Sequence, residues 1–92
     1  MAIKAFPTKD PDSILDYGFM WGDWLDVGDI IVSSIWILPT GLTEDSSTFT
    51  DTTTTIWLRG GLLDEKYTVV NRITTQDGRT EDQSAIMQIK QH

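Results

Sequence analysis

β-Branched residues recur along this chain in short runs separated by turn signals, and almost no segment has the 3.6-residue period of an amphipathic helix. Threonine is the commonest residue of these runs. Side chains of this kind favour the pleated, half-exposed surface of a strand. The pattern therefore predicts an all-β fold.

The C-terminal third has the clearest strand signals. Alternation predicts inward side chains at Tyr67, Val69, Ile73, Ala85, Met87 and Ile89. Asp77-Gly78 is typical of a hairpin turn, because both residues tolerate the positive φ values that primed turns require. We expect strands at about 66–75 and 83–90. Asn71 shares the inward parity, so it should hydrogen-bond a loop backbone or mark a β-bulge.

The run from Ile30 to Leu38 is apolar in both parities, which predicts a central strand buried on both faces. Trp36, within this run, and Tyr67 are the aromatic residues expected in the core. The Ser/Thr-rich stretch from Glu44 to Thr55 is interpreted as a loop followed by a strand with one wet face. Gly60-Gly61 predicts a sharp reversal, because glycine permits positive φ.

A chain of 92 residues predicts one β-sandwich domain over residues 1–92. Residues 1–17 are expected to form an extended N-terminal arm, because Pro7 and Pro11 remove backbone donors and suit sheet edges. A domain this small has little room for a deep pocket, so a functional site should lie on its surface.

Composition and charge exclude several classes of function. The formal net charge of −7 argues against nucleic acid and anionic membranes as partners. The chain has no cysteine, and its single histidine, His92, is the last residue, so nucleophilic and histidine-based catalysis lack their groups. We therefore predict no catalytic residues, no cofactor and no enzymatic activity. The N-terminus lacks a signal peptide and no apolar run is long enough to cross a bilayer, which predicts a soluble protein made in a cytoplasm.

Aspartates crowd the first third of the chain. Asp26 and Asp29, on either side of Gly28, could offer two oxygens to calcium, but no D-x-D-x-D-G loop with a closing Glu is present. We predict no metal site. The acidic residues are expected to form a solvated or partner-facing surface.

Four tryptophans are many for a chain of 92 residues, and at least one is expected to be exposed. Exposed aromatic side chains mark interface anchors or sugar-stacking platforms, and both interpretations stay open. We expect protein contacts to be made by residues 7–29 together with the edge of the sandwich, with which a neighbouring chain could pair by strand addition. The aspartates of residues 7–29 would steer the chain towards a basic surface. The candidate interface residues are Tyr17, Phe19, Trp21, Trp24, Trp57, Asp23, Asp26 and Asp29.

Trp36 and the step from Tyr67 to Val69 resemble an immunoglobulin-like sandwich, in which such a Tyr hydrogen-bonds to the chain just upstream. A longer series of short segments resembles the phage fiber-tail adaptor proteins of tailed bacteriophages over about residues 9–90. The segments that match are Lys9–Asp12, Leu15–Tyr17, Asp23–Leu25, Gly28–Ile31, Ser33–Trp36, Gly41–Thr43, Thr54–Gly61, Tyr67–Thr75 and Gly78–Thr80 with Asp82. The chain departs from the family pattern at Leu62–Lys66, where the family has a Gly-rich turn.

The resemblance implies an immunoglobulin-like virion protein that is made in the host bacterial cytoplasm. It would act without catalysis and join a fiber or neighbouring protein to the tail, neck or baseplate. Its partners would be other virion proteins, with several symmetric copies in each particle. Two alternatives remain. One is a carbohydrate-binding or adhesive sandwich that uses Trp21, Trp24 or Trp57 as a platform. The other is a head-decoration or tail-tube subunit.

Overall fold

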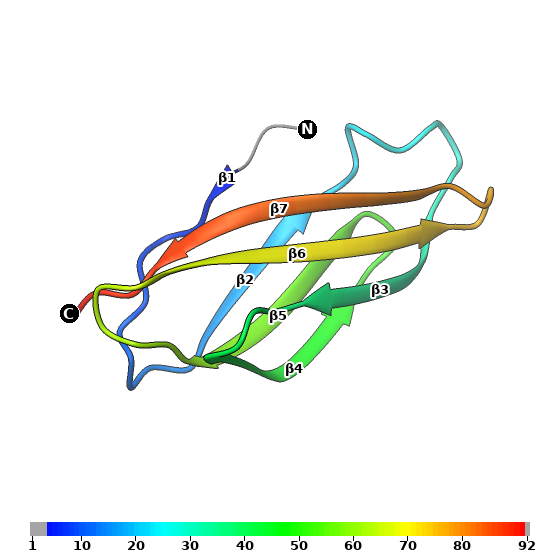
Figure 1. The fold of residues 1–92 in the computed structure, drawn as a ribbon. Coiled ribbons are helices and arrows are strands. Elements are labelled where there is room, and N and C mark those ends of the chain that lie inside the picture. The colour runs from blue at the N-terminus through cyan, green and yellow to red at the C-terminus, as the bar shows by residue number, and fades with distance from the viewer. Residues whose placement is uncertain (1–3, 92) are drawn as a thin grey trace.

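The strands of this protein form two sheets that pack face to face (Figure 1). The computed structural model describes residues 4–91. In sequence order the strands are β1 (Lys4–Ala5), β2 (Leu15–Met20), β3 (Ile31–Ile37), β4 (Leu42–Phe49), β5 (Thr53–Gly60), β6 (Lys66–Thr75) and β7 (Thr80–Gln88). One sheet has the order β1-β7-β6-β3 and the other β2-β5-β4. All neighbours are antiparallel except β1 and β7, which run parallel. This arrangement confirms the all-β sandwich.

The hydrophobic core lies between the two sheets because the central strands alternate inward and outward side chains. In β6 the buried positions follow every second residue from Tyr67 to Thr75. Tyr67, Val69, Ile73, Ala85, Met87 and Ile89 are all buried, as the alternation predicted. The β6–β7 hairpin is also confirmed, and Gly78 in its turn has a φ of 88°. Gly60 and Gly61 have φ values of 85° and 97°, so the predicted reversal there is confirmed.

Tyr67 is fixed by the loop that precedes it. The backbone N–H of Leu62 donates a hydrogen bond to Tyr67 Oη over 2.9 Å. This is the upstream contact that the immunoglobulin resemblance implied for Tyr67. The ring also approaches Gly41, where an added Cβ would lie 2.9 Å from Tyr67 Oη. Gly41 has a φ of 109°, so both the space and the backbone conformation require glycine there.

The prediction for Ile30–Leu38 was wrong about its place in the sheet. β3 is the edge strand of its sheet, and its outward residues Val32, Ile35 and Ile37 are exposed. A β-bulge between Ile31 and Ser33 changes the parity, so that Trp36 faces inward. Trp36 is half-buried and its ring stacks on Phe19, with centroids 5.7 Å apart.

The interpretation of the stretch from Glu44 onwards also needs correction. Residues 44–49 belong to β4, which pairs with β5 from Leu42 to Phe49, and the loop is confined to the short turn before Thr53. Only Leu42 of this strand is buried. An edge strand with two solvated faces needs few apolar residues, which is why its sequence resembled a loop.

Candidate functional site

The N-terminal arm does not project from the sandwich. Residues 4 and 5 pair with β7, the Phe6 N–H donates to the Ile86 carbonyl over 3.0 Å, and the Lys9 N–H donates to the Gln88 carbonyl over 3.1 Å. The Lys90 N–H donates a hydrogen bond to the Lys9 carbonyl. Residues 4–9 of the arm therefore cover the edge of β7 through backbone hydrogen bonds.

Lys9 anchors the end of this arm in the interior. Its side chain is fully buried, and its Nζ donates to the carbonyls of Asp10 and Gly60 over 2.9 and 2.8 Å. Burial lowers the pKa of the Lys9 ammonium, while the carboxylates of Asp10 and Asp12 act in the opposite direction. Nothing in the sequence distinguished Lys9 from an ordinary exposed lysine.

Three of the candidate interface residues lie in the core. Tyr17, Phe19 and Trp21 are all buried, and Phe6 of the arm packs against Tyr17 and Phe19 with ring centroids 5.1 and 5.3 Å apart. Trp21 Nε1 donates to the side-chain oxygens of Asn71 and Thr54. Because these side chains are enclosed, they cannot be direct contacts for a partner in this conformation.

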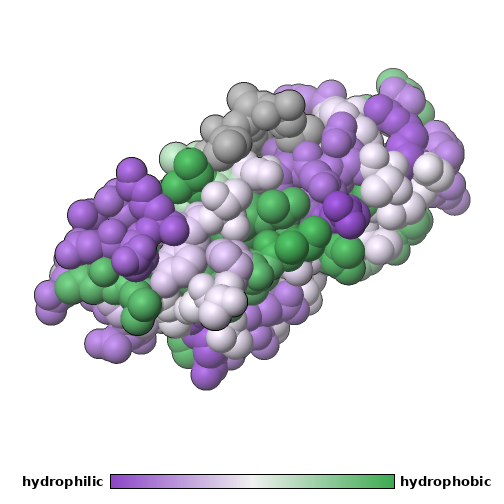
Figure 2. All heavy atoms as spheres, viewed as in Figure 1, coloured by the Kyte–Doolittle hydropathy of each residue, from purple (hydrophilic) through white to green (hydrophobic). Residues whose placement is uncertain are grey.

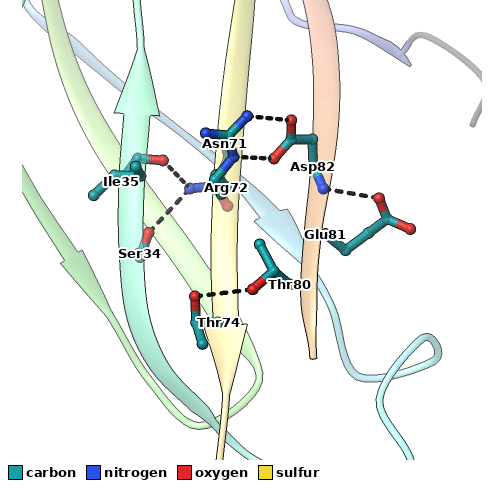
Figure 3. A network of polar contacts seen from close by, with 8 residues as sticks. All are labelled: Ser34, Ile35, Asn71, Arg72, Thr74, Thr80, Glu81 and Asp82. Carbon is teal, nitrogen blue, oxygen red and sulfur yellow. Dashed lines mark hydrogen bonds and ion pairs between the residues drawn. The ribbon is translucent and has the colours of Figure 1, made fainter. Parts of the chain in front are cut away.

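Asn71 joins the two sheets through a buried network. Its Oδ1 accepts from Trp21 Nε1 over 3.0 Å and from the Thr54 hydroxyl over 2.7 Å. Its Nδ2 donates to Ser34 Oγ and to the Ile35 carbonyl, both over 3.0 Å (Figure 3). The backbone acceptor therefore belongs to a strand, whereas the sequence predicted a loop backbone or a bulge at Asn71.

The loop after β2 is held against the β6–β7 hairpin by Arg79. The Arg79 guanidinium lies 4.1 Å from the centroid of the Trp24 ring, and its Nη1 lies 3.3 Å from Asp26 Oδ2. Trp24 also packs edge-on against Trp21, with centroids 5.5 Å apart. Trp24 is thus half-buried between the core and Arg79.

The buried side chain of Asp29 connects the loop after β2 to the β6–β7 hairpin. Its Oδ1 accepts hydrogen bonds from the N–H groups of Ile30 and Asp77 over 3.0 and 3.1 Å. Burial acts to raise the pKa of Asp29, but hydrogen bonds from Thr75, Asp77 and Ile30 and the charge of Arg79 outweigh it, so the pKa is lowered. Asp29 is therefore used within the chain, whereas Asp23 and Asp26 are exposed.

Neither a metal centre nor a membrane-spanning helix is found in the described part of the chain. Residues 4–91 contain no group of three or more acidic or histidine side chains placed to hold a metal ion. Asp26 pairs with Arg79, and Asp29 Oδ1 accepts from two backbone amides, while Asp29 Oδ2 is buried and has no hydrogen-bond partner among the described residues. No helix in this range is long and apolar enough to cross a membrane. His92 lies outside the described residues.

Exposed apolar side chains instead gather on the sandwich surface. The prediction that at least one tryptophan is exposed is confirmed by Trp57, whose exposed fraction is 40%. Ile35 and Ile37 on β3 are 51% and 43% exposed, and Val70 of β6 is the register partner of Ile37. Figure 2 shows apolar residues gathered over the middle of one face of the molecule. Sequence reasoning missed Ile35 and Ile37 because it placed their strand in the centre.

The surface is acidic because fourteen Asp and Glu outnumber seven Lys and Arg. The ion pairs among residues 4–91 are Arg59–Asp45, Arg72–Asp82, Arg79–Asp26 and Lys90–Asp64. Arg72 and Asp82 form a two-bond contact across neighbouring strands (Figure 3), which lowers the pKa of Asp82 chiefly through these hydrogen bonds. Asp23, Glu44 and Asp51 are exposed and have no such cation partner within this range. The surface therefore favours a basic partner.

Comparison with known protein families identifies the chain. The model of a family described as podophage GP4 fiber-tail adaptor protein gp77 matches residues 9–88. The chain belongs to this family of phage fiber-tail adaptors. The match runs from the buried Lys9 to the last residue of β7, so it covers both sheets except β1. A comparison with curated proteins gives no match. The adaptor is accordingly a structural component of a phage virion that binds other virion proteins.

Proposed function

We propose that the adaptor joins a fiber or neighbouring protein to the tail, neck or baseplate of the particle through protein-protein contacts alone. The observation that carries this proposal is the family match over residues 9–88, because it covers nearly the whole sandwich and not a single motif. Several symmetric copies would act in each particle, and the protein would be made in the cytoplasm of the host bacterium. No catalytic step is part of the proposed function.

The surface supports a protein partner in preference to nucleic acid or a membrane. Nucleic acids and anionic lipids reward clusters of Lys and Arg, whereas this chain has seven such residues against fourteen Asp and Glu. Four of the cations are in ion pairs and Lys9 is buried. Half-exposed Trp57, Asp23 and Asp26 remain candidate contact residues, together with the apolar outer side of β3.

Carbohydrate binding is the less favoured function. Of its three tryptophan platforms, Trp21 is buried and Trp24 is covered by Arg79, so only Trp57 offers an exposed ring. A head-decoration or tail-tube subunit would differ from an adaptor in its place in the particle. The position of the protein in the particle therefore distinguishes an adaptor from a head-decoration or tail-tube subunit. Binding to a glycan array tests the carbohydrate-binding function.

The experiment is to delete the gene for this chain from its phage and to examine the particles by electron microscopy. We expect tails that lack their fibers, and purified adaptor added back should restore them. Labelled adaptor should lie at the junction of fiber and tail. Labels on the head or along the tube, or fibers that attach normally without the chain, would overturn the proposal.

A further inference from the structure

The two sheets leave unequal edges. β1 covers β7, but β3 pairs with β6 alone, and within residues 4–91 no strand pairs with its other side. β2 and β4 are the outer strands of the second sheet. An uncovered edge presents a row of backbone donors and acceptors that another extended chain can pair with.

β4 and β2 carry features that protect a sheet edge from pairing with another strand, whereas most of β3 lacks such features. β4 contains Glu44 and Asp45 and a bulge between Glu44 and Ser46, and β2 carries the exposed Asp16. Charges and bulges of this kind discourage further pairing. β3 contains no charged residue, and after its early bulge the residues from Ser33 to Ile37 keep a regular register with β6. This segment is therefore the edge best able to accept another strand.

The outer side of this edge is also apolar. Ile35 and Ile37 are about half exposed, and Ile37 lies beside Val70, which in turn pairs with Ser84 of β7. An added strand would place alternate side chains next to Ile35 and Ile37 on this face. Backbone pairing and apolar burial would thus act at the same five residues.

Charge decides which occupant fits. Asp51 lies at the start of β3, where its carbonyl accepts from the Ile31 N–H over 3.0 Å, and its side chain is exposed. Glu44 follows the turn that leads away from the other end of β3, and it is also exposed. A second copy would bring the same carboxylates and a net charge of −7 to the same place. A segment with Lys or Arg would instead be attracted.

We propose that the free edge of β3, over residues 33–37, accepts an extended segment of a different virion protein by strand addition. The segment has apolar side chains that cover Ile35 and Ile37 and at least one Lys or Arg directed towards Asp51 or Glu44. This inference rests on the proposed function and assigns it to one edge of the sandwich.

Hydrogen exchange of the wild-type adaptor tests the backbone pairing directly. Purified adaptor is added to particles assembled without it, and the exchange of its amides is compared between the bound and the free chain. Amides of residues 33–37 that face the free edge should exchange at least about tenfold more slowly once bound. Unchanged exchange at these amides in the bound adaptor would overturn the proposal.

Ile35→Lys places a charge on the outer side of the edge and should reduce incorporation into these particles at least about tenfold. Leu62→Lys is the matched control, because it makes the same charge change at an exposed position of the loop between β5 and β6, outside both residues 7–29 and the edge of β3, and should incorporate normally. Thermal unfolding of both variants checks the fold. If Ile35→Lys lowers the melting temperature, Ile35→Thr removes the apolar surface while keeping a β-branched residue. Normal incorporation of the folded β3 variant would overturn the proposal.

A single cysteine identifies the occupant, because the natural chain has none. Ser33→Cys adaptor carrying a thiol-linked photo-crosslinker should give a product with a fiber or tail protein in the particle. A product between two adaptors would overturn the proposed occupant in favour of a second copy. The two proposals fail separately. Wild-type adaptor that does not enter particles contradicts the adaptor function, whereas adaptor that enters with an unchanged β3 contradicts only the strand addition.

Discussion

At the scale of single residues, two neighbouring buried amides differ in how well they are satisfied. Asn71 and Gln83 are register partners on β6 and β7, and both are buried. The Asn71 side chain has partners at both its oxygen and its nitrogen, whereas Gln83 Oε1 accepts no hydrogen bond from the described residues. An unsatisfied buried group costs about 1–3 kcal/mol, so the two positions should respond differently to an apolar substitution.

Asn71→Leu should reduce the free energy of unfolding by about 2–4 kcal/mol, because it leaves the Ile35 carbonyl and the Trp21–Thr54 pair without their amide partner. Gln83→Leu is the matched control and should change it by less than about 1 kcal/mol, because it removes an acceptor that is already unpaired. Urea unfolding of both variants measures the difference. Equal losses would mean that the Asn71 network does not stabilise the sandwich.

Asp29 makes stability depend on pH. Its pKa in the folded chain is lowered, so the folded state favours the carboxylate more than the unfolded chain does. The resulting stabilisation is complete above the unfolded pKa of about 3.9 and is lost as the pH falls through the lower folded value. Asp29→Asn should therefore show a shallower fall in melting temperature between about pH 5 and pH 2. Asp23→Asn, at an exposed position of the same loop, controls for the loss of one negative charge. A parallel pH curve for Asp29→Asn and wild type would contradict this role.

At the scale of the strands, the sequence pattern predicted the strands at the centre of the sandwich better than those at its edges. Alternation located β6 and residues 83–88 of β7, because both strands have one buried and one wet face, but it missed the first three residues of β7 and placed its end two residues too late. The same reasoning placed β3 wrongly, in the centre of the sheet. A run that is apolar in both parities indicates burial on both faces, but it does not tell whether the protein's own sheets or a partner cover those faces. The two serines at the middle of that run are the one local sign of exposure.

The candidate site was harder to predict than the fold. Tyr17, Phe19 and Trp21 occupy every second position, so strand alternation alone would have placed all three on one inward face. The presence of Pro7 and Pro11 instead favoured a loose arm. Lys9 could not have been found, because its burial depends on the carbonyl of Gly60, far away in the sequence. Long-range contacts of this kind leave no local pattern.

The docking of the arm makes it part of the sandwich, which changes what its removal should do. An extended arm, as the sequence predicted for residues 1–17, could be deleted without loss of the fold. Because Phe6 packs on Tyr17 and Phe19, Phe6→Ala alone should now reduce the free energy of unfolding by about 2–3 kcal/mol. Met20→Ala, at an exposed position of β2, is the control and should change it by less than about 0.5 kcal/mol. Chemical denaturation measures both, and an unchanged midpoint for Phe6→Ala would show that the arm only rests on the sandwich.

At the scale of the whole molecule, charge and apolar surface are expected to act at different stages of binding. Unpaired carboxylates surround a sandwich whose cations are mostly paired or buried. Their field extends about 10 Å at 0.1 M salt and so acts before contact. The apolar outer side of β3 acts only after contact, because burial of apolar surface has no such range. The rate of association and the rate of dissociation should therefore respond to different changes.

Glu44→Gln with Asp51→Asn should slow the association of the adaptor with adaptor-free particles, while the dissociation rate should change little. Raising the salt concentration from about 0.05 to 0.5 M should slow wild-type association by about tenfold, because the screening length falls well below the separation at which the partners first meet. The double variant should lose part of this salt dependence, since two of the exposed carboxylates near β3 are gone. Val27→Thr changes an exposed apolar side chain without changing charge, so it should keep the full dependence. Stopped-flow measurements with fluorescently labelled adaptor give both rates. Association that is independent of salt would show that the acidic surface serves solubility and not the encounter with a basic partner.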